Sequence, residues 1–173
     1  MRKSITIFAS TIVILSASMA LLKAHLFVAR VVGSSMSPAL HEGDQVLAIT
    51  RWPARWLRRG QIVLISPAQA VGPSKHYLAP HVPTHMYIKR IRAIAGDIIQ
   101  TSLEEVDEVL RPEVAAEHDS QGYRTWHIPP RTVFVQGDYV PGGYDSLLWG
   151  PLPNSSIFGL VVLKLPRTTS ESG

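Results

Sequence analysis

Residues 86–94 read MYIKRIRAI and decide the fold class of this chain. Apolar side chains recur along the stretch around a single lysine, Lys89, a pattern typical of a β-strand that faces a hydrophobic core. Five other runs are short, rich in valine and isoleucine, and bounded by glycine, proline or aspartate, which also predicts strands. These runs are residues 44–49, 61–65, 97–101, 132–136 and 157–165.

The rest of the chain agrees with a mainly β domain. Its 13 prolines argue against long helices, so we expect coiled antiparallel β-sheets. Residues 101–118 resist this interpretation because they carry many carboxylates, and they could form a short helix or a solvated insertion. Their acidity indicates a solvent-exposed surface more than a cation-binding site. The carboxylates are Glu104, Glu105, Asp107, Glu108, Glu113 and Glu117.

Composition excludes several classes of site. The chain has no cysteine, so neither a disulfide nor a thiolate metal site exists and the core must be held by burial. The net charge of +4 is too diffuse to predict a nucleic-acid partner. His76, His81 and His85 could bind zinc, but irregularly spaced loop histidines are more often solvated. We predict no metal and no cofactor, and the oligomeric state stays open.

An apolar segment begins the chain. Residues 5–22 are uncharged and mainly apolar, and as a helix they span about 27 Å, just short of a hydrocarbon core of roughly 30 Å. Adding residues 24–32, with Lys23 and Arg30 reaching toward the headgroups, closes the gap. We expect one transmembrane helix, with the amino terminus inside and the following domain outside.

A cleaved secretory signal is the alternative for the same segment. Arg2 and Lys3 form a short basic region, and residues 18–20 are small enough for a cleavage site. The anchor interpretation divides the chain into three parts. These are a transmembrane anchor with its flank at 1–28, an extracytoplasmic β-rich domain at 29–166 and a flexible tail at 167–173.

A second apolar feature suits the surface of a membrane. Trp52, Trp56 and Leu57 alternate with arginines, and such a mixture can contact anionic headgroups. An ordinary loop whose tryptophans pack on the domain explains the residues equally well. The arginines are Arg51, Arg55, Arg58 and Arg59.

Two residues have side chains that could take part in catalysis and have few other reactive groups near them in the sequence. They are Ser35, beside a turn stiffened by a proline, and Lys89, within the apolar strand. A serine hydroxyl is a poor nucleophile unless a neighbouring base takes its proton. Lysine can do so only when neutral, so its pKa of about 10.4 must fall by roughly three units, equivalent to about 4 kcal/mol. Burial in a core strand could supply that desolvation. On chemistry alone, Ser34 and Ser37 are rival nucleophiles.

Several blocks, in order, carry a family resemblance. They are SMSP at 35–38, GDQVL at 43–47, RGQIV at 59–63, KRI at 89–91 with GD at 96–97, GD at 137–138, DS at 145–146 and WG at 149–150. The chain resembles the bacterial type I signal peptidases, the S26 Ser/Lys membrane peptidases that remove signal sequences from exported proteins. The resemblance implies a coiled antiparallel β-sheet peptidase domain at the cell membrane, whose partners are signal-peptide-bearing precursors and the lipid bilayer.

The resemblance also implies roles for individual residues. Ser35 matches the acylating nucleophile and Lys89 its general base, while Asp145 and Ser146 match a supporting pair near the lysine. Three positions depart from the family pattern. Gly33 and Gly143 stand where the family often has serines that bind the oxyanion and orient the lysine, and Leu147 replaces an arginine that would pair with Asp145.

Substrate pockets follow from the same resemblance. Signal peptidases accept small residues one and three positions before the cut, and Ile88 with Val31 or Val32 would line those pockets. Met36 is expected in the core or in a pocket beside the nucleophile. The substrate would pair as an added strand along an exposed sheet edge.

Three functions remain open on the sequence. The leading one is a general signal peptidase, and a specialised processing peptidase for pilin or secreted-peptide precursors would look nearly identical. A catalytically inactive membrane-anchored scaffold with the same fold is the third, although the presence of both Ser35 and Lys89 speaks against it. A cytosolic self-cleaving repressor with a Ser/Lys pair is disfavoured by the apolar amino terminus.

Overall fold

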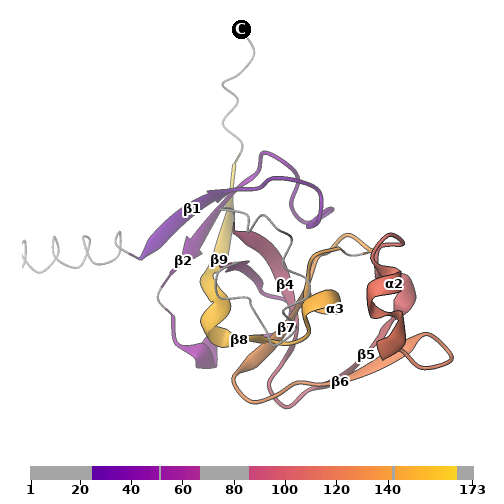
Figure 1. The fold of residues 1–173 in the computed structure, drawn as a ribbon. Helices are drawn as coiled ribbons and strands as arrows, with labels where there is room; N and C mark the ends of the chain where they lie inside the picture. Colours follow the sequence, from indigo (N-terminus) through magenta and orange to yellow (C-terminus); the bar gives the residue numbers. More distant parts are fainter. Residues whose placement is uncertain (1–24, 51, 67–85, 142, 167–173) are drawn as a thin grey trace, which may run out of the picture.

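The computed structural model describes residues 25–50, 52–66, 86–141 and 143–166 (Figure 1). These residues form a seven-stranded antiparallel sheet in the order β1-β2-β9-β3-β4-β7-β8 and a two-stranded sheet, β5-β6. Figure 1 shows the β5-β6 pair extending to one side of the large sheet, with the short helix α2 beside it. The strands are β1 (Leu26–Arg30), β2 (Gln45–Ile49), β3 (Ile62–Ile65), β4 (Tyr87–Ile94), β5 (Ile98–Ser102), β6 (Tyr123–His127), β7 (Thr132–Gln136), β8 (Leu152–Pro153) and β9 (Ile157–Leu165).

The mainly β fold predicted from the sequence is confirmed. All six predicted strands are present, as β2, β3, β4, β5, β7 and β9, with bounds that differ by about one residue. β1, β6 and the two-residue β8 were not predicted. β1 overlaps the segment assigned from the sequence to the anchor and its flank, and it pairs with β2 along its whole length.

The large sheet bends because its ladders are interrupted. Register shifts occur between Leu47 and Ala48 in the β2–β9 pair, between Leu64 and Ile65 in the β3–β9 pair, and at 91–93 in the β4–β7 pair. Each irregularity increases the local twist of a strand and bends it. The resulting curvature gives the coiled sheet that the sequence predicted.

The two faces of the large sheet carry different cores. Because successive residues of a strand point to opposite faces, Lys89 and its partner Val63 lie on one face while Ile88 and Leu64 lie on the other. The Val63 face carries a cluster centred on buried valine, isoleucine and leucine side chains of β3, β4 and β7. The Ile88 face packs against a smaller cluster, which contains Val31, Met36, Leu40 and Val46.

The acidic segment folds into short helical turns. They are η4 (Leu103–Glu105), α2 (Arg111–Val114) and η5 (Ala115–Glu117). Val106 and Val114 are fully buried in a third cluster with Trp126 and Phe134, so the segment is fastened to the domain. Of its carboxylates, Glu105 pairs with Arg92 and Glu117 with Arg124.

The tryptophan loop packs partly on the domain. Leu57 is buried and Trp52 packs against the Val63-face cluster, whereas Trp56 in the short helix η1 (Ala54–Trp56) is 47% exposed. Arg59 forms a bidentate ion pair with Asp97.

Several sequence predictions concern residues outside the described part of the chain. These include the transmembrane helix at 5–22, His76, His81 and His85, Arg51, and the tail at 167–173. Within the described ranges, none of the helices combines the length and apolar character that a bilayer crossing needs.

Candidate active site

Ser35 lies in a tight turn that leaves β1. Val31 continues the pairing with β2, since its N–H donates to the Asp44 carbonyl at 2.8 Å and its own carbonyl accepts the Gly43 N–H at 2.9 Å. Met36 is only 1% exposed and anchors the turn in the core, whereas Ser35 beside it is exposed. The turn therefore exposes the Ser35 side chain to solvent, while the neighbouring Met36 side chain is held in the core.

Lys89 comes from the middle of β4 and is 4% exposed. Burial lowers the pKa of its ammonium group because the charged form loses its hydration, and the nearby Asp145 carboxylate opposes the shift without cancelling it. A lysine in this environment loses its proton more readily than one in water. The strand pattern around residue 89 predicted this burial.

Gly137 brings the two segments together. A Cβ atom built at this position would lie 2.5 Å from the Ser35 carbonyl oxygen and 3.5 Å from Lys89 Nζ. The Ser35 carbonyl also accepts the Tyr139 N–H at 3.1 Å, two residues further along. The chain after β7 thus touches both the Ser35 turn and the tip of Lys89, and there is no room for a side chain at this point.

Asp145 is fully buried at the start of the short helix α3 (Ser146–Trp149). Its carboxylate accepts the Leu147 N–H at 2.9 Å and the Gly137 N–H at 3.1 Å. Burial raises the pKa of Asp145, while the charge of Lys89 acts in the opposite direction. Asp145 therefore joins α3 to the glycine that contacts both Ser35 and Lys89.

Ser146 has a different partner. Its hydroxyl is fully buried and accepts the Val135 N–H of β7 at 3.0 Å. The two members of the predicted supporting pair thus face different groups, Asp145 toward the lysine and Ser146 toward the strand backbone. Ser146 fastens α3 to the sheet.

An open, mainly apolar groove of about 550 Å³ runs beside Ser35. One wall comes from β1 and the residues that follow it, and the other comes from the beginning of β4, with Leu64 between them. All four residues predicted to line substrate pockets border this groove. They are Val31, Val32, Met36 and Ile88. Ser35 borders it too, so the exposed serine and the four apolar residues share one surface.

The three positions that depart from the family pattern have different surroundings. Gly33 has a φ of 80°, a conformation that favours glycine, and a Cβ there would have nothing within 4 Å. Gly143 likewise has open space around it. Leu147 is buried in the apolar cluster with Trp126, so its side chain offers Asp145 no charge.

An ion pair beside the site was not predicted from the sequence, although the resemblance already matched Asp138, with Gly137, to the turn that leads into Asp145 and Ser146. Arg90, next to Lys89, forms a bidentate ion pair with Asp138 at 2.7 and 2.6 Å, and Asp138 follows Gly137. This pair holds β4 to the segment after β7, where Gly137 lies. Both residues stand inside the blocks that carry the resemblance, but their pairing joins positions 48 residues apart and no local pattern reveals it.

Comparison with known proteins agrees with the geometry. Residues 4–165 match the family model described as signal peptidase, peptidase S26. The chain is 30% identical over 141 residues to the mitochondrial ATP-independent inner membrane protease subunit 1b of Arabidopsis thaliana, covering 80% of this chain and 69% of that protein. It is 28% identical to the mitochondrial inner membrane protease subunit 2 of Danio rerio, with 77% and 60% covered.

A plastid protein is similar as well. The thylakoidal processing peptidase 1 of Arabidopsis thaliana is 30% identical over 139 residues, which cover 76% of this chain but 39% of that protein. The alignments thus span less than two thirds of the length of two of these three relatives. The family model covers nearly the whole chain, and the resemblance seen in the sequence is confirmed: this chain belongs to the peptidase S26 signal peptidase family.

Proposed function

We propose that this protein is a membrane-anchored serine endopeptidase that cleaves signal peptides from exported precursors, with Ser35 as nucleophile and Lys89 as general base. The observation that carries the proposal is the convergence on Gly137, whose missing side chain leaves room for both the Ser35 backbone and Lys89 Nζ. Family membership and the names of the relatives, which are membrane proteases and processing peptidases, support the same reaction.

The chemistry requires the lysine to begin uncharged. Neutral Lys89 accepts the hydroxyl proton of Ser35 as its Oγ attacks the carbonyl carbon of the scissile peptide bond. The resulting ammonium group returns that proton to the leaving amine, and the peptide C–N bond breaks to leave an acyl-serine ester. Lys89 then takes a proton from water as the water oxygen attacks the ester carbonyl carbon. The ester C–O bond breaks, the Lys89 ammonium group returns the proton to Ser35 Oγ, and the carboxylic acid leaves with Ser35 and neutral Lys89 restored.

The negative charge that develops on the substrate oxygen needs a donor. In this chain Gly33 supplies no hydroxyl, so the backbone N–H of Ser35 is the proposed donor. The positive φ of Gly33 sets the direction in which the chain enters the Ser35 turn, and through that turn it orients the Ser35 peptide group.

The substrate would lie extended in the groove between the β1 wall and the beginning of β4. Main-chain hydrogen bonds to these two walls would fix its register. The apolar side chains of Val31, Met36 and Ile88 would leave shallow pockets that admit small residues one and three positions before the cut.

The amino-terminal segment would attach the domain to the membrane. Residues 5–22 are proposed as a single-pass anchor in the cell membrane, with the catalytic domain on the extracytoplasmic side. The groove wall begins at Phe27, only five positions after the apolar run ends, so the site would work close to the bilayer. A precursor whose apolar signal lies in the same bilayer would present its cleavage site there.

Cleavage of a signal-bearing precursor by the purified full-length chain in detergent tests the proposal. The intact chain should cleave the precursor, and Ser35→Ala should abolish cleavage while circular dichroism shows an unchanged fold. Ser34→Ala is the matched control, because Ser34 is exposed in the same turn but does not border the groove, and it should remain active.

Two outcomes would contradict the proposal. Failure of the intact chain to cleave any of a panel of precursors would favour the inactive scaffold, and full activity of Ser35→Ala would exclude Ser35 as nucleophile. Within the panel, cleavage of a single precursor class would indicate a dedicated processing peptidase, and cleavage of many would indicate a general one.

A further inference from the structure

The proposed reaction creates a charge problem around Asp145. When Lys89 is neutral and Asp145 is ionised, the buried pair carries one net negative charge. An isolated buried carboxylate is strongly disfavoured unless hydrogen bonds and a nearby cation compensate it. Two backbone N–H groups bind Asp145, but Leu147 contributes only its backbone to this support.

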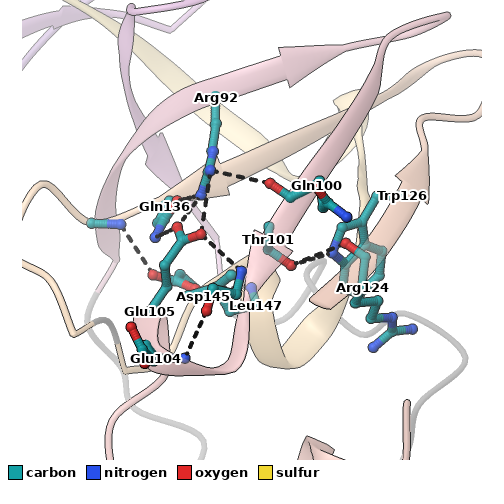
Figure 2. Close-up of polar contacts among 12 residues, drawn as sticks. Arg92, Gln100, Thr101, Glu104, Glu105, Arg124, Trp126, Gln136, Asp145 and Leu147 are labelled. Atoms are coloured by element: carbon teal, nitrogen blue, oxygen red, sulfur yellow. Dashed lines mark hydrogen bonds and ion pairs between the residues drawn. The ribbon is translucent and has the colours of Figure 1, made fainter. Parts of the chain in front are cut away.

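Arg92 lies where it can supply the missing positive charge. It follows Lys89 by three positions on β4 and is one third exposed. Its guanidinium donates to the Gln136 side-chain carbonyl and to Glu105, and more weakly to the Gln100 carbonyl at 3.4 Å. Figure 2 shows Arg92 reaching toward Gln136 and Glu105, with Asp145 and Leu147 below this cluster.

Further contacts fix the cluster and connect it to the site. Glu105 also accepts the Ser102 N–H at 2.9 Å and the Gln136 side-chain N–H at 3.3 Å. Gln136 is 6% exposed and immediately precedes Gly137, whose N–H binds Asp145. The guanidinium of Arg92 therefore has a defined position, and its charge acts on Asp145, lowering the pKa of that carboxyl group against the effect of burial.

We propose that Arg92 is a positioning residue that compensates the buried Asp145 carboxylate, and that Glu105 and Gln136 hold it in place. This inference rests on the proposed function, because it concerns the protonation of the proposed base Lys89. Arg92 does not border the groove, so it acts on the protonation of the site rather than on substrate binding.

The direction of its effect follows from counting charges. The Lys89–Asp145 pair is neutral overall while it holds one proton, and it becomes singly negative when Lys89 loses that proton to become a base. A nearby positive charge favours the deprotonated pair and a nearby negative charge opposes it. Removing Arg92 should therefore make the pair hold its proton to higher pH, and neutralising Glu105 should do the reverse.

The other ionisable groups around the pair do not change this sign. Two cations act on Asp145, namely Lys89 and Arg92. On the opposite face of β4, Arg90 pairs with Asp138. Tyr87 is uncharged near neutral pH, because burial and Tyr144 raise the pKa of its phenol group.

The test measures kcat and KM for precursor cleavage against pH, using the full-length chain in detergent. Arg92→Met should move the acidic limb of the kcat/KM profile to higher pH by about one unit, which lowers the rate about tenfold on that limb. KM should change little. Arg92→Lys, which keeps the charge, should restore most of the activity.

Glu105→Gln provides a second variant with the opposite expected sign. Glutamine can still accept the Ser102 N–H in the capping box at η4, so the turn should persist while the negative charge is lost. The acidic limb should then move to lower pH. Arg124→Met is the matched control, because Arg124 is also a partly buried arginine paired with a glutamate, and Figure 2 shows it directed away from the Arg92 cluster. Its profile should not move.

Opposite shifts in Arg92→Met and Glu105→Gln would support the electrostatic role. Unchanged limbs, or shifts in the same direction, would overturn it, and if Arg92→Met fails to fold, the Glu105→Gln shift still decides. The proposed function fails separately: if Ser35→Ala remains active, the dyad itself is wrong. If Ser35→Ala is inactive but the acidic limb of the kcat/KM profile is unchanged in Arg92→Met and Glu105→Gln, only this inference is overturned.

Discussion

Two lysines of this domain face fully buried aspartates, yet their surroundings differ. Lys164 lies 2.5 Å from the Asp44 carboxylate, and its own side chain is 45% exposed, so water solvates its charge. Lys89 faces Asp145 but is 4% exposed, and burial lowers its pKa despite that carboxylate. A carboxylate alone thus does not decide whether a lysine can act as a base. Exclusion of water does, because it removes the stabilisation of the ammonium form.

The largest expected difference is in the activity lost when each of the two lysines is replaced. Lys89→Met should lower kcat/KM for precursor cleavage by at least about 100-fold, because a general base commonly contributes a factor of that size. Lys164→Met should retain activity within about twofold, since its ion pair lies outside the proposed chemistry. Cleavage assays on both variants, with circular dichroism to confirm folding, make the comparison. Equal activity of the two variants would break it.

The two aspartates should differ in a smaller effect. Asp145→Asn removes the charge that holds the proton on Lys89, so the acidic limb of the kcat/KM profile should move to lower pH by roughly one unit. Asp44→Asn should leave that limb where it is. The pH profiles of the two variants measure this difference. A limb that moves equally in both would mean that Asp145 has no special influence on the base.

The smallest expected effect is the contribution of Lys89 to the pH dependence of the free energy of unfolding. Since burial lowers the pKa of Lys89 in the folded state, the unfolded chain binds more protons at pH values between the lowered pKa and the ordinary one. The free energy of unfolding should therefore rise with pH across that window, by about 1.4 kcal/mol for each unit of lowering.

Urea denaturation of the full-length chain at a series of pH values measures that rise. Lys89→Met should abolish it and Lys164→Met should keep it. A rise of the same size in Lys89→Met would assign the effect to another group and would remove the main distinction between the two lysines.

Much of the fold could be predicted because its signals are local. Runs of valine and isoleucine between glycine, proline and aspartate marked six of the nine strands in the described residues, including β4 and its buried lysine. β1 was missed because its apolar residues continue the hydrophobic segment before it. β6 was missed because its sequence, YRTWH, mixes polar and aromatic residues and buries only Trp126 deeply.

The candidate site was only partly predictable for a related reason. Ser35, Lys89 and the four groove residues lie within short motifs, and the structure places them along one groove or around one glycine. The Arg92 cluster joins β4 to a glutamate 13 residues later and a glutamine 44 residues later. No periodicity links these positions, because a curled sheet brings them together only after all its strands have paired.

The alternation of β4 has one further consequence, for changes in chain length. Lys89 points to the buried face while Arg90 reaches the opposite face and pairs with Asp138. Losing one residue just before Lys89 would exchange these two directions and turn a guanidinium inward. Arginine keeps its proton at any physiological pH and has no lone pair to offer. A deletion of a single residue at this point should therefore remove the proposed base, because neither Arg90 nor the displaced Lys89 could take its place.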